Sequence, residues 1–203
     1  MQRSSFLLVF VLTYTYSILA IGQSYVEEIA AHRAHYKEEF LKSLNSPLKE
    51  ADLAYLRFFD SDSTFRVVAD FVRTQGSEPF SMPTYSGMQK EYVKYGELHF
   101  RLNQQKLSLS VYRSLSLMQQ PMYRDYLFIP FKDATSANET YGGGRYMDIR
   151  MGEIKKGVCV LDFNKAYNPY CAYLDGYNCP IPPKENHLPV KIEAGEKNFA
   201  KEH

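Results

Sequence analysis

The stretch that decides the fold is residues 97–111, ELHFRLNQQKLSLSV. Apolar side chains occupy every second position on both sides of Asn103-Gln104-Gln105. A period of two indicates a strand with one buried face, so the two runs predict a β-hairpin. The apolar positions are Leu98, Phe100, Leu102, Leu107, Leu109 and Val111.

Similar patterns extend on both sides of the hairpin. From residue 64, Phe65, Val67, Ala69 and Phe71 alternate with their neighbours and predict an earlier strand. Proline and glycine separate further strand-like runs. These runs are 126–131, 145–151, 158–164 and 188–193. About seven or eight such antiparallel strands predict a mainly β domain, either a small barrel or a sandwich.

One or two helices are expected before the sheet, within residues 24–56. Ser24 and Glu27 form a capping box for a helix over 24–44. Pro47 can open a second, short helix over 48–56. The expected apolar stripe of the first helix is Val26, Ile29, Tyr36, Phe40 and Leu44.

The first residues match a cleavable export signal. Positive charge at Arg3 precedes the apolar run Phe6–Val11, and the small residues Ala20 and Gly22 favour cleavage before Gln23. The apolar run is too short for a membrane anchor, which needs about 20 apolar residues. We therefore expect residues 1–22 to be removed and 23–203 to form one domain in the periplasm or outside the cell, with no integral membrane segment.

The composition narrows the class of partner. The chain has 24 Lys+Arg and 23 Asp+Glu, so it lacks the basic excess that phosphate backbones require, and we expect no nucleic-acid partner. Tyrosine is abundant, at 17 residues, and tryptophan is absent. Tyrosine buries its ring but needs a hydrogen-bond partner for its hydroxyl, which suits pocket walls.

Residues 131–196 carry long motifs unlike the rest of the chain. They are FKDAT at 131–135, ETYGGGRY at 139–146, LDFNKAYNPYCAY at 161–173, CPIPPKEN at 179–186 and AGE at 194–196. This block resembles a bacterial domain-of-unknown-function family, number sixteen-eighty-four, from the first helix to Glu196. The resemblance implies no established activity. Ser136 and His187 depart from its pattern, where glycine and arginine are common.

Arg145 has two interpretations. It follows three glycines, which let the backbone approach closely, and its guanidinium could grip a carboxylate or phosphate. Alternatively it pairs with Asp133 or Asp162 inside the fold. The glycines alone do not predict a phosphate loop, which also needs a lysine and a helix.

Asp162 and Asn164 also have two interpretations. On a strand they would share the polar face and point to solvent or a cavity. Asn168-Pro169 lies next to them, and Asp and Asn side chains in such turns tie the nearby backbone instead.

The three cysteines predict different roles. Outside the cytoplasm, Cys171 and Cys179 are expected to form a disulfide across a short loop. The resemblance implies that relatives without an export signal keep both, which would fit free thiols, a metal site or a nucleophile helped by His99 or His187. Cys159 reads as a small buried hydrophobe. We predict no metal site and no cofactor.

Three functions remain open. A binding module would hold a small polar or anionic ligand between segments 141–146 and 162–173. A hydrolase would use carboxylates among Asp133, Glu139, Asp162 and Glu196, or Cys171. In a structural envelope protein, the motif residues would only stabilise the fold through internal contacts. The candidate ligand-binding residues are Asp133, Thr135, Tyr141, Arg145, Tyr146, Asp162, Asn164, Tyr167, Asn168, Cys171, Tyr173 and Asn186.

Overall fold

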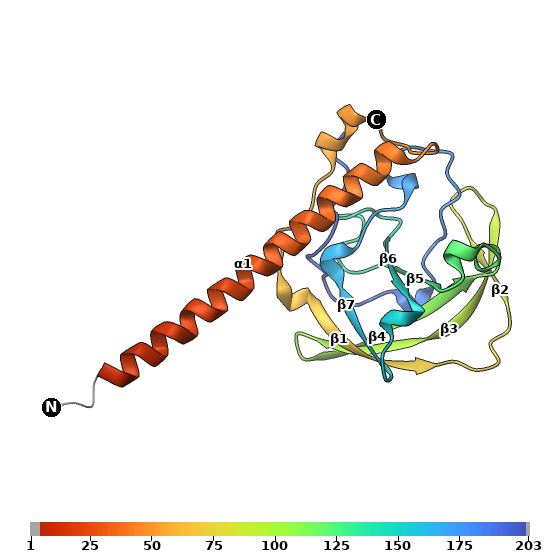
Figure 1. Ribbon diagram of the computed structural model, residues 1–203. Coiled ribbons are helices and arrows are strands. Elements are labelled where there is room, and N and C mark those ends of the chain that lie inside the picture. Colours follow the sequence, from red (N-terminus) through yellow and green to blue (C-terminus); the bar gives the residue numbers. More distant parts are fainter. Residues whose placement is uncertain (1–4, 202–203) are drawn as a thin grey trace.

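The computed structural model describes residues 5–201, with side chains from residue 24 onward. Its main feature is one antiparallel seven-stranded sheet that curls into a half-barrel (Figure 1). The strands are β1 (Arg66–Arg73), β2 (Phe80–Pro83), β3 (Gln89–Leu102), β4 (Gln105–Ser114), β5 (Tyr126–Phe131), β6 (Arg145–Arg150) and β7 (Val158–Asp162). The order β6-β5-β4-β3-β1-β7, with β2 on β3, leaves β6 and β7 as edges. The predicted mainly β antiparallel domain is confirmed.

The predicted hairpin forms the centre of the sheet. Leu98 pairs with Leu109 and Phe100 with Leu107, so the alternating apolar positions share one face. The turn is one residue shorter than predicted, because Asn103 and Gln104 both adopt positive φ and close it as a pair. β3 begins at Gln89, well before the alternating run, because a bulge between Lys94 and Gly96 shifts the register and hides the pattern.

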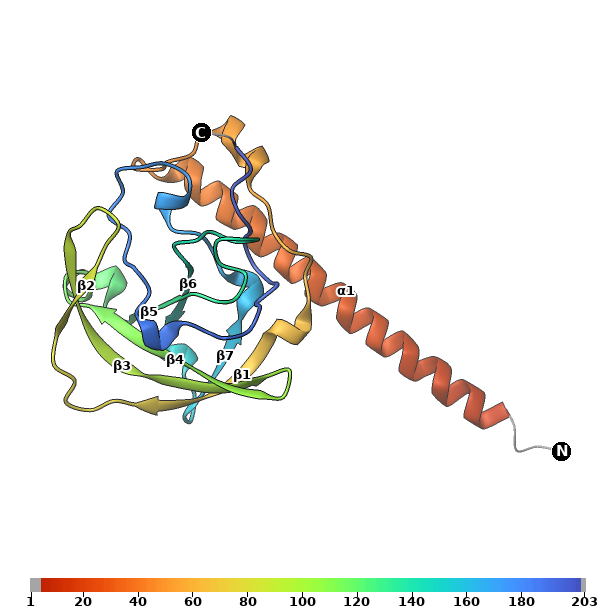
Figure 2. The same cartoon turned by 180° about the vertical axis from the view of Figure 1, so that it is seen from behind.

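The concave face of the sheet holds the main core. Figures 1 and 2 show the C-terminal segment running inside this curl, where Leu188, Ile192 and Ala194 are buried. The predicted strand over 188–193 is wrong, because this segment is irregular and only a few of its groups bond to residues 132–134. Strand residues of the core include Val67, Leu98, Phe100, Leu109, Leu127, Ile129, Met147, Ile149 and Leu161.

The opposite face of the sheet carries a second, aromatic layer. Tyr92, Tyr112, Phe128 and Tyr146 are buried there, with Met82 from β2. They alternate with core residues along their strands, as Phe128 does between Leu127 and Ile129. The sheet is therefore apolar on both faces in this region, and loops must cover its outer side.

The helix α1 (Ser5–Lys42) packs along the domain through its C-terminal half (Figure 2). It is continuous through Ser24, so the predicted N-cap there is wrong. Its buried side chains are Tyr25, Ile29 and Phe40, whereas Val26 is 47% exposed and Leu44 lies beyond the helix. The predicted stripe was therefore partly misplaced.

The second predicted helix is a 3-10 helix (Glu50–Tyr55) that starts after Lys49 rather than at Pro47. Leu48 and Leu56 are buried at its two ends and hold the segment against α1 through Phe40. Within residues 5–201, no helix has the length and apolar character needed to cross a membrane.

Candidate functional site

Arg145 lies inside the fold. Its side chain is 1% exposed, and Nη2 donates to Asp133 Oδ2 at 2.5 Å. The guanidinium also donates to the carbonyls of Ile192 (2.9 Å), Glu196 (3.2 Å) and Ala194. Arg145 therefore forms an internal ion pair, as the second interpretation predicted, and its partner is Asp133 rather than Asp162.

Gly144, directly before Arg145, lets β6 pack closely against β5. Gly144 has φ 92°, and a Cβ there would lie 2.6 Å from the carbonyl oxygen of Phe131. Only glycine lets the chain enter β6 this close to β5.

Several other motif residues also bond within the domain. Thr135 donates its backbone N–H to Asp133 at 2.6 Å and closes the loop after β5. Asn186 joins two strands, because its amide accepts from Ser110 N (2.7 Å) and donates to Ser110 O (2.9 Å) and Pro130 O (2.7 Å). Tyr173 donates to Glu196. All five of these motif residues are buried, namely Asp133, Thr135, Tyr173, Asn186 and Glu196.

Asp162 and Asn164 do not share a strand face. β7 ends at Asp162, whose Oδ1 accepts the Asn164 backbone N–H at 3.1 Å and opens a 3-10 turn. The predicted strand over 158–164 is thus two residues too long. Asn164 is 1% exposed and donates to the Asp62 carbonyl and to Tyr25, so it ties loops as the alternative interpretation described.

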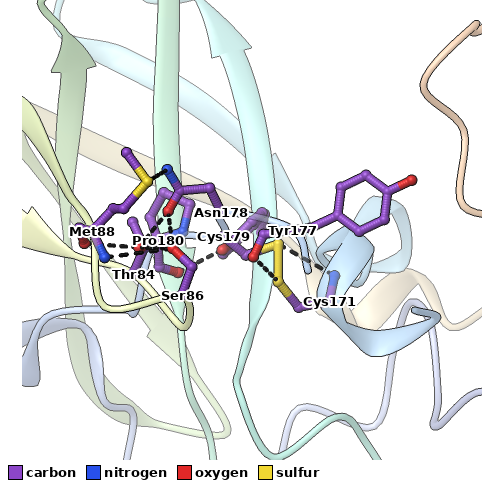
Figure 3. The surroundings of a disulfide bond; sticks show 9 residues. Thr84, Ser86, Met88, Cys171, Tyr177, Asn178, Cys179 and Pro180 are labelled. Atoms are coloured by element: carbon purple, nitrogen blue, oxygen red, sulfur yellow. Dashed lines mark hydrogen bonds between the residues drawn. A yellow bond between two sulfur atoms is a disulfide. The ribbon is translucent and has the colours of Figure 1, made fainter. Parts of the chain in front are cut away.

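Cys171 and Cys179 form the expected disulfide, with their Cα atoms 6.3 Å apart. Figure 3 shows the bridge beside the β2 turn, where Asn178 Oδ1 accepts from Ser86 at 2.6 Å and also from Thr84. The loop 171–179 is thereby fixed against the outer face of the sheet. Cys159 is free and buried, and burial raises its thiol pKa to about 11, as expected of an inert hydrophobe.

The two segments expected to flank a pocket touch each other. Tyr146 and Tyr167 exchange backbone hydrogen bonds of 2.8 and 3.0 Å. Two hollows lie at this contact instead, and both have Tyr167 in their walls. Tyr141 is half-buried against Tyr85, outside both hollows.

The first hollow, which we name the tyrosine groove, has a volume of about 300 Å³. It lies on the outer face between the sheet and the disulfide loop, and six tyrosines converge on it. They are Tyr92, Tyr126, Tyr146, Tyr167, Tyr170 and Tyr177. Of the candidate residues, Tyr146, Tyr167 and Asn168 line this groove, together with Cys179.

The polar groups of the tyrosine groove are an amine, an amide and two tyrosine hydroxyls. Lys90 is half-buried, burial lowers its pKa, and it has no salt-bridge partner among residues 24–201. Asn168 Oδ1 is buried and accepts no hydrogen bond from the described part of the chain. Burial raises the pKa of Tyr126 and Tyr167, so these phenols remain protonated and act as hydrogen-bond donors to Asp148 (2.6 and 2.8 Å).

Lys90, Tyr92, Tyr126, Tyr170 and Tyr177 were not among the predicted residues. The abundance of tyrosine was the one sequence signal for them. Their convergence depends on the pairing of β3 with β4 and of β5 with β6, and on the path of the disulfide loop.

A family model described as a protein of unknown function (DUF1684) matches residues 51–197. The chain belongs to the DUF1684 family. It is also similar to an uncharacterised protein of Haloarcula marismortui solved by NMR, with 29% identity and a TM-score of 0.66. That match covers 88% of this chain and 96% of the other. No curated protein matches the chain.

Glu196 is a second buried acid of this DUF1684 chain, besides Asp133. It is fully buried and accepts from Tyr36 (3.0 Å), Tyr173 (2.7 Å) and the Asn168 backbone N–H (2.9 Å). Burial outweighs these donors and raises its pKa to about 7. The folded state therefore binds a proton more tightly than the unfolded chain does.

This shift predicts a pH-dependent stability. The contribution of Glu196 is fully present below its ordinary pKa of 4.5 and is lost as pH rises through about 7. We expect the free energy of unfolding of the wild type to fall by roughly 3 kcal/mol between pH 5 and 8.5, and this fall to be absent in Glu196→Gln. Chemical denaturation at both pH values measures it. The matched control is Glu193→Gln, at a half-exposed position. Equal pH dependence of wild type and Glu196→Gln would contradict the assignment.

Proposed function

We propose that this DUF1684 chain is an exported binding module that holds a small, ring-bearing polar ligand in the tyrosine groove. The observation that carries the proposal is the convergence of six tyrosines on one hollow. Aromatic walls offer large, rigid contact area, and the phenol hydroxyls and nearby amides add directional hydrogen bonds. These are recognition groups for a flat, hydroxylated or aromatic ring.

The charge of the groove indicates where an anionic substituent would lie. Lys90 is the cation of the groove and has no internal partner among residues 24–201. A carboxylate on the ligand would give it one, and the hollow of about 300 Å³ suits a single ring. The proposed ligand class is therefore a monocyclic acid, either an aromatic acid or an acidic sugar.

The groups present favour binding over hydrolysis. Cys171 is held in the disulfide and is not available as a thiolate nucleophile. Asp133 and Glu196 are buried within the fold, and neither side chain lines the tyrosine groove.

The export part of the proposal rests on two features. The N-terminal residues have the charge, apolar run and small residues of a cleavable signal. The disulfide is of a kind that persists in oxidising compartments.

Export predicts a specific mature end. When the full chain is expressed in a bacterial host, we expect the protein in the periplasm or medium to begin at Gln23. Intact mass should also show one free thiol, Cys159, until a reductant is added. The measurement is N-terminal sequencing with mass spectrometry. Retention in the cytoplasm with residues 1–22 attached would contradict export.

Ligand binding predicts selective losses among groove variants. Thermal shift and calorimetric titration test binding of monocyclic acids such as 4-hydroxybenzoate and glucuronate. For the acid that binds, we expect Lys90→Ala to weaken affinity about tenfold through the lost charged hydrogen bond. Tyr170→Ala should weaken it about three- to tenfold through the lost ring contact.

Lys106→Ala and Tyr55→Ala are the matched controls, because both residues lie outside the tyrosine groove. Neither should change the affinity. If the acid binds Lys90→Ala and Tyr170→Ala as it binds wild type, the site is not this groove. If no monocyclic acid raises the melting temperature, the ligand class is wrong.

A further inference from the structure

A second hollow lies where the curled sheet fails to close. It has a volume of about 400 Å³ and is lined by Met147–Ile149 of β6 and Val160–Asp162 of β7, the two edge strands. α1 contributes His32 and Tyr36. We name this hollow the seam cleft; its remaining lining residues are Arg66, Glu153, Lys165 and Tyr167.

The cations of the seam cleft are already engaged. Arg66 and Lys165 both contact Glu28, at 2.7 and 3.0 Å. Burial lowers the pKa of His32, so its imidazole is mostly neutral at pH 7. Glu28 can balance only one of these two cations, and Asp162, whose Oδ2 lies 3.8 Å from Arg66 Nε, balances the other.

The acids of the seam cleft are not balanced in the same way. Asp148 and Glu153 form no salt bridge among residues 24–201, because Arg150 pairs with Asp125. Burial raises the pKa of Asp148, against the hydrogen bonds from Tyr126 and Tyr167 and the nearby charge of Arg150. The Asp162 side chain is only 6% exposed, and its Oδ2 accepts no hydrogen bond from the described residues. The nearest cation to that oxygen, Arg66 Nε, is 3.8 Å away. The cleft thus has an excess of negative charge and an unused acceptor.

Aromatic rings complete the chemistry of the seam cleft. Tyr36 and Tyr167 both line it, with ring centroids 6.1 Å apart and planes tilted by 49°. Ring faces beside carboxylates attract organic cations, which gain both charge pairing and cation–π contact. A bare metal ion is a poorer fit, because residues 24–201 contain no cluster of three or more metal-ligating side chains.

We propose that the seam cleft binds a small organic cation, an alkylamine or quaternary ammonium compound, through Asp148 and Glu153 and the rings of Tyr36 and Tyr167. The site does not rest on the proposed function, but it shares Tyr167 with the tyrosine groove, and Tyr126 and Tyr167 both donate to Asp148. Lys90 has no part in it.

The test is calorimetric titration of the full chain with choline and with 1,4-diaminobutane. The uncharged 1,4-butanediol is the matched ligand control. At least one amine should bind, and the diol should not. Asp148→Asn and Glu153→Gln should each weaken amine binding about tenfold, as expected for a lost charged contact. Glu193→Gln, outside the cleft, and Lys90→Ala should leave it unchanged.

Three results would overturn the proposal. They are no binding of either amine at millimolar concentration, equal binding of the diol, and unchanged affinity in folded Asp148→Asn and Glu153→Gln. Competition by Mg²⁺ or Ca²⁺ at equal concentration would assign the cleft to a metal instead. If Asp148→Asn does not fold, the amine affinity of Glu153→Gln tests the proposal.

The Lys90→Ala variant tests binding of an acid to the tyrosine groove. Each of the two proposed sites can therefore be disproved without the other.

Discussion

The interaction on which the rest of this structure depends is the buried pair of Arg145 and Asp133. An isolated charge in a protein interior is very costly, and the cost is offset only where both ions have further hydrogen-bond partners. Asp133 has Thr135, and Arg145 has the carbonyls of residues 192–196. The guanidinium therefore supplies the hydrogen-bond donors that a neighbouring strand would otherwise supply to the C-terminal segment. This explains how an irregular chain can lie inside the curl of the sheet with its carbonyl groups satisfied.

The position of that segment has consequences for the surface. Because the C-terminal segment fills the concave face, the sheet remains open, and its two edge strands β6 and β7 line the seam cleft. The outer face carries aromatic residues that need cover, which the disulfide loop supplies. The loop leaves the tyrosine groove between itself and the sheet. The motifs thus build the scaffold and also supply part of the groove wall, through Tyr146, Tyr167 and Tyr170. The other proposed binding groups of the groove, Lys90, Tyr92, Tyr126 and Tyr177, lie outside the motifs.

The sequence predicted those parts in which local pattern and tertiary contact agree. The 97–111 hairpin is confirmed because side-chain period and burial coincide there. The strand over 126–131 is confirmed because its continuous apolar run is buried on both faces of the sheet. The strand over 188–193 was wrong, since its apolar residues pack in the core while its backbone bonds to Arg145 and loops. The groove was predicted only in part, through Tyr146, Tyr167 and Asn168. Lys90 and Tyr177 join it through the path of the disulfide loop over the outer face of the sheet, and the sequence pattern does not indicate that path.

The most direct test of this account is the free energy of unfolding of Arg145→Met, measured by urea denaturation. Methionine keeps much of the side-chain volume but leaves Asp133 and the C-terminal carbonyls without their donor. We expect a loss of about 3–5 kcal/mol, as for breaking a buried ion pair. Arg150→Met, at an exposed pair with Asp125, should cost less than about 1 kcal/mol. An Arg145→Met variant as stable as Arg150→Met would contradict the central role of the buried pair.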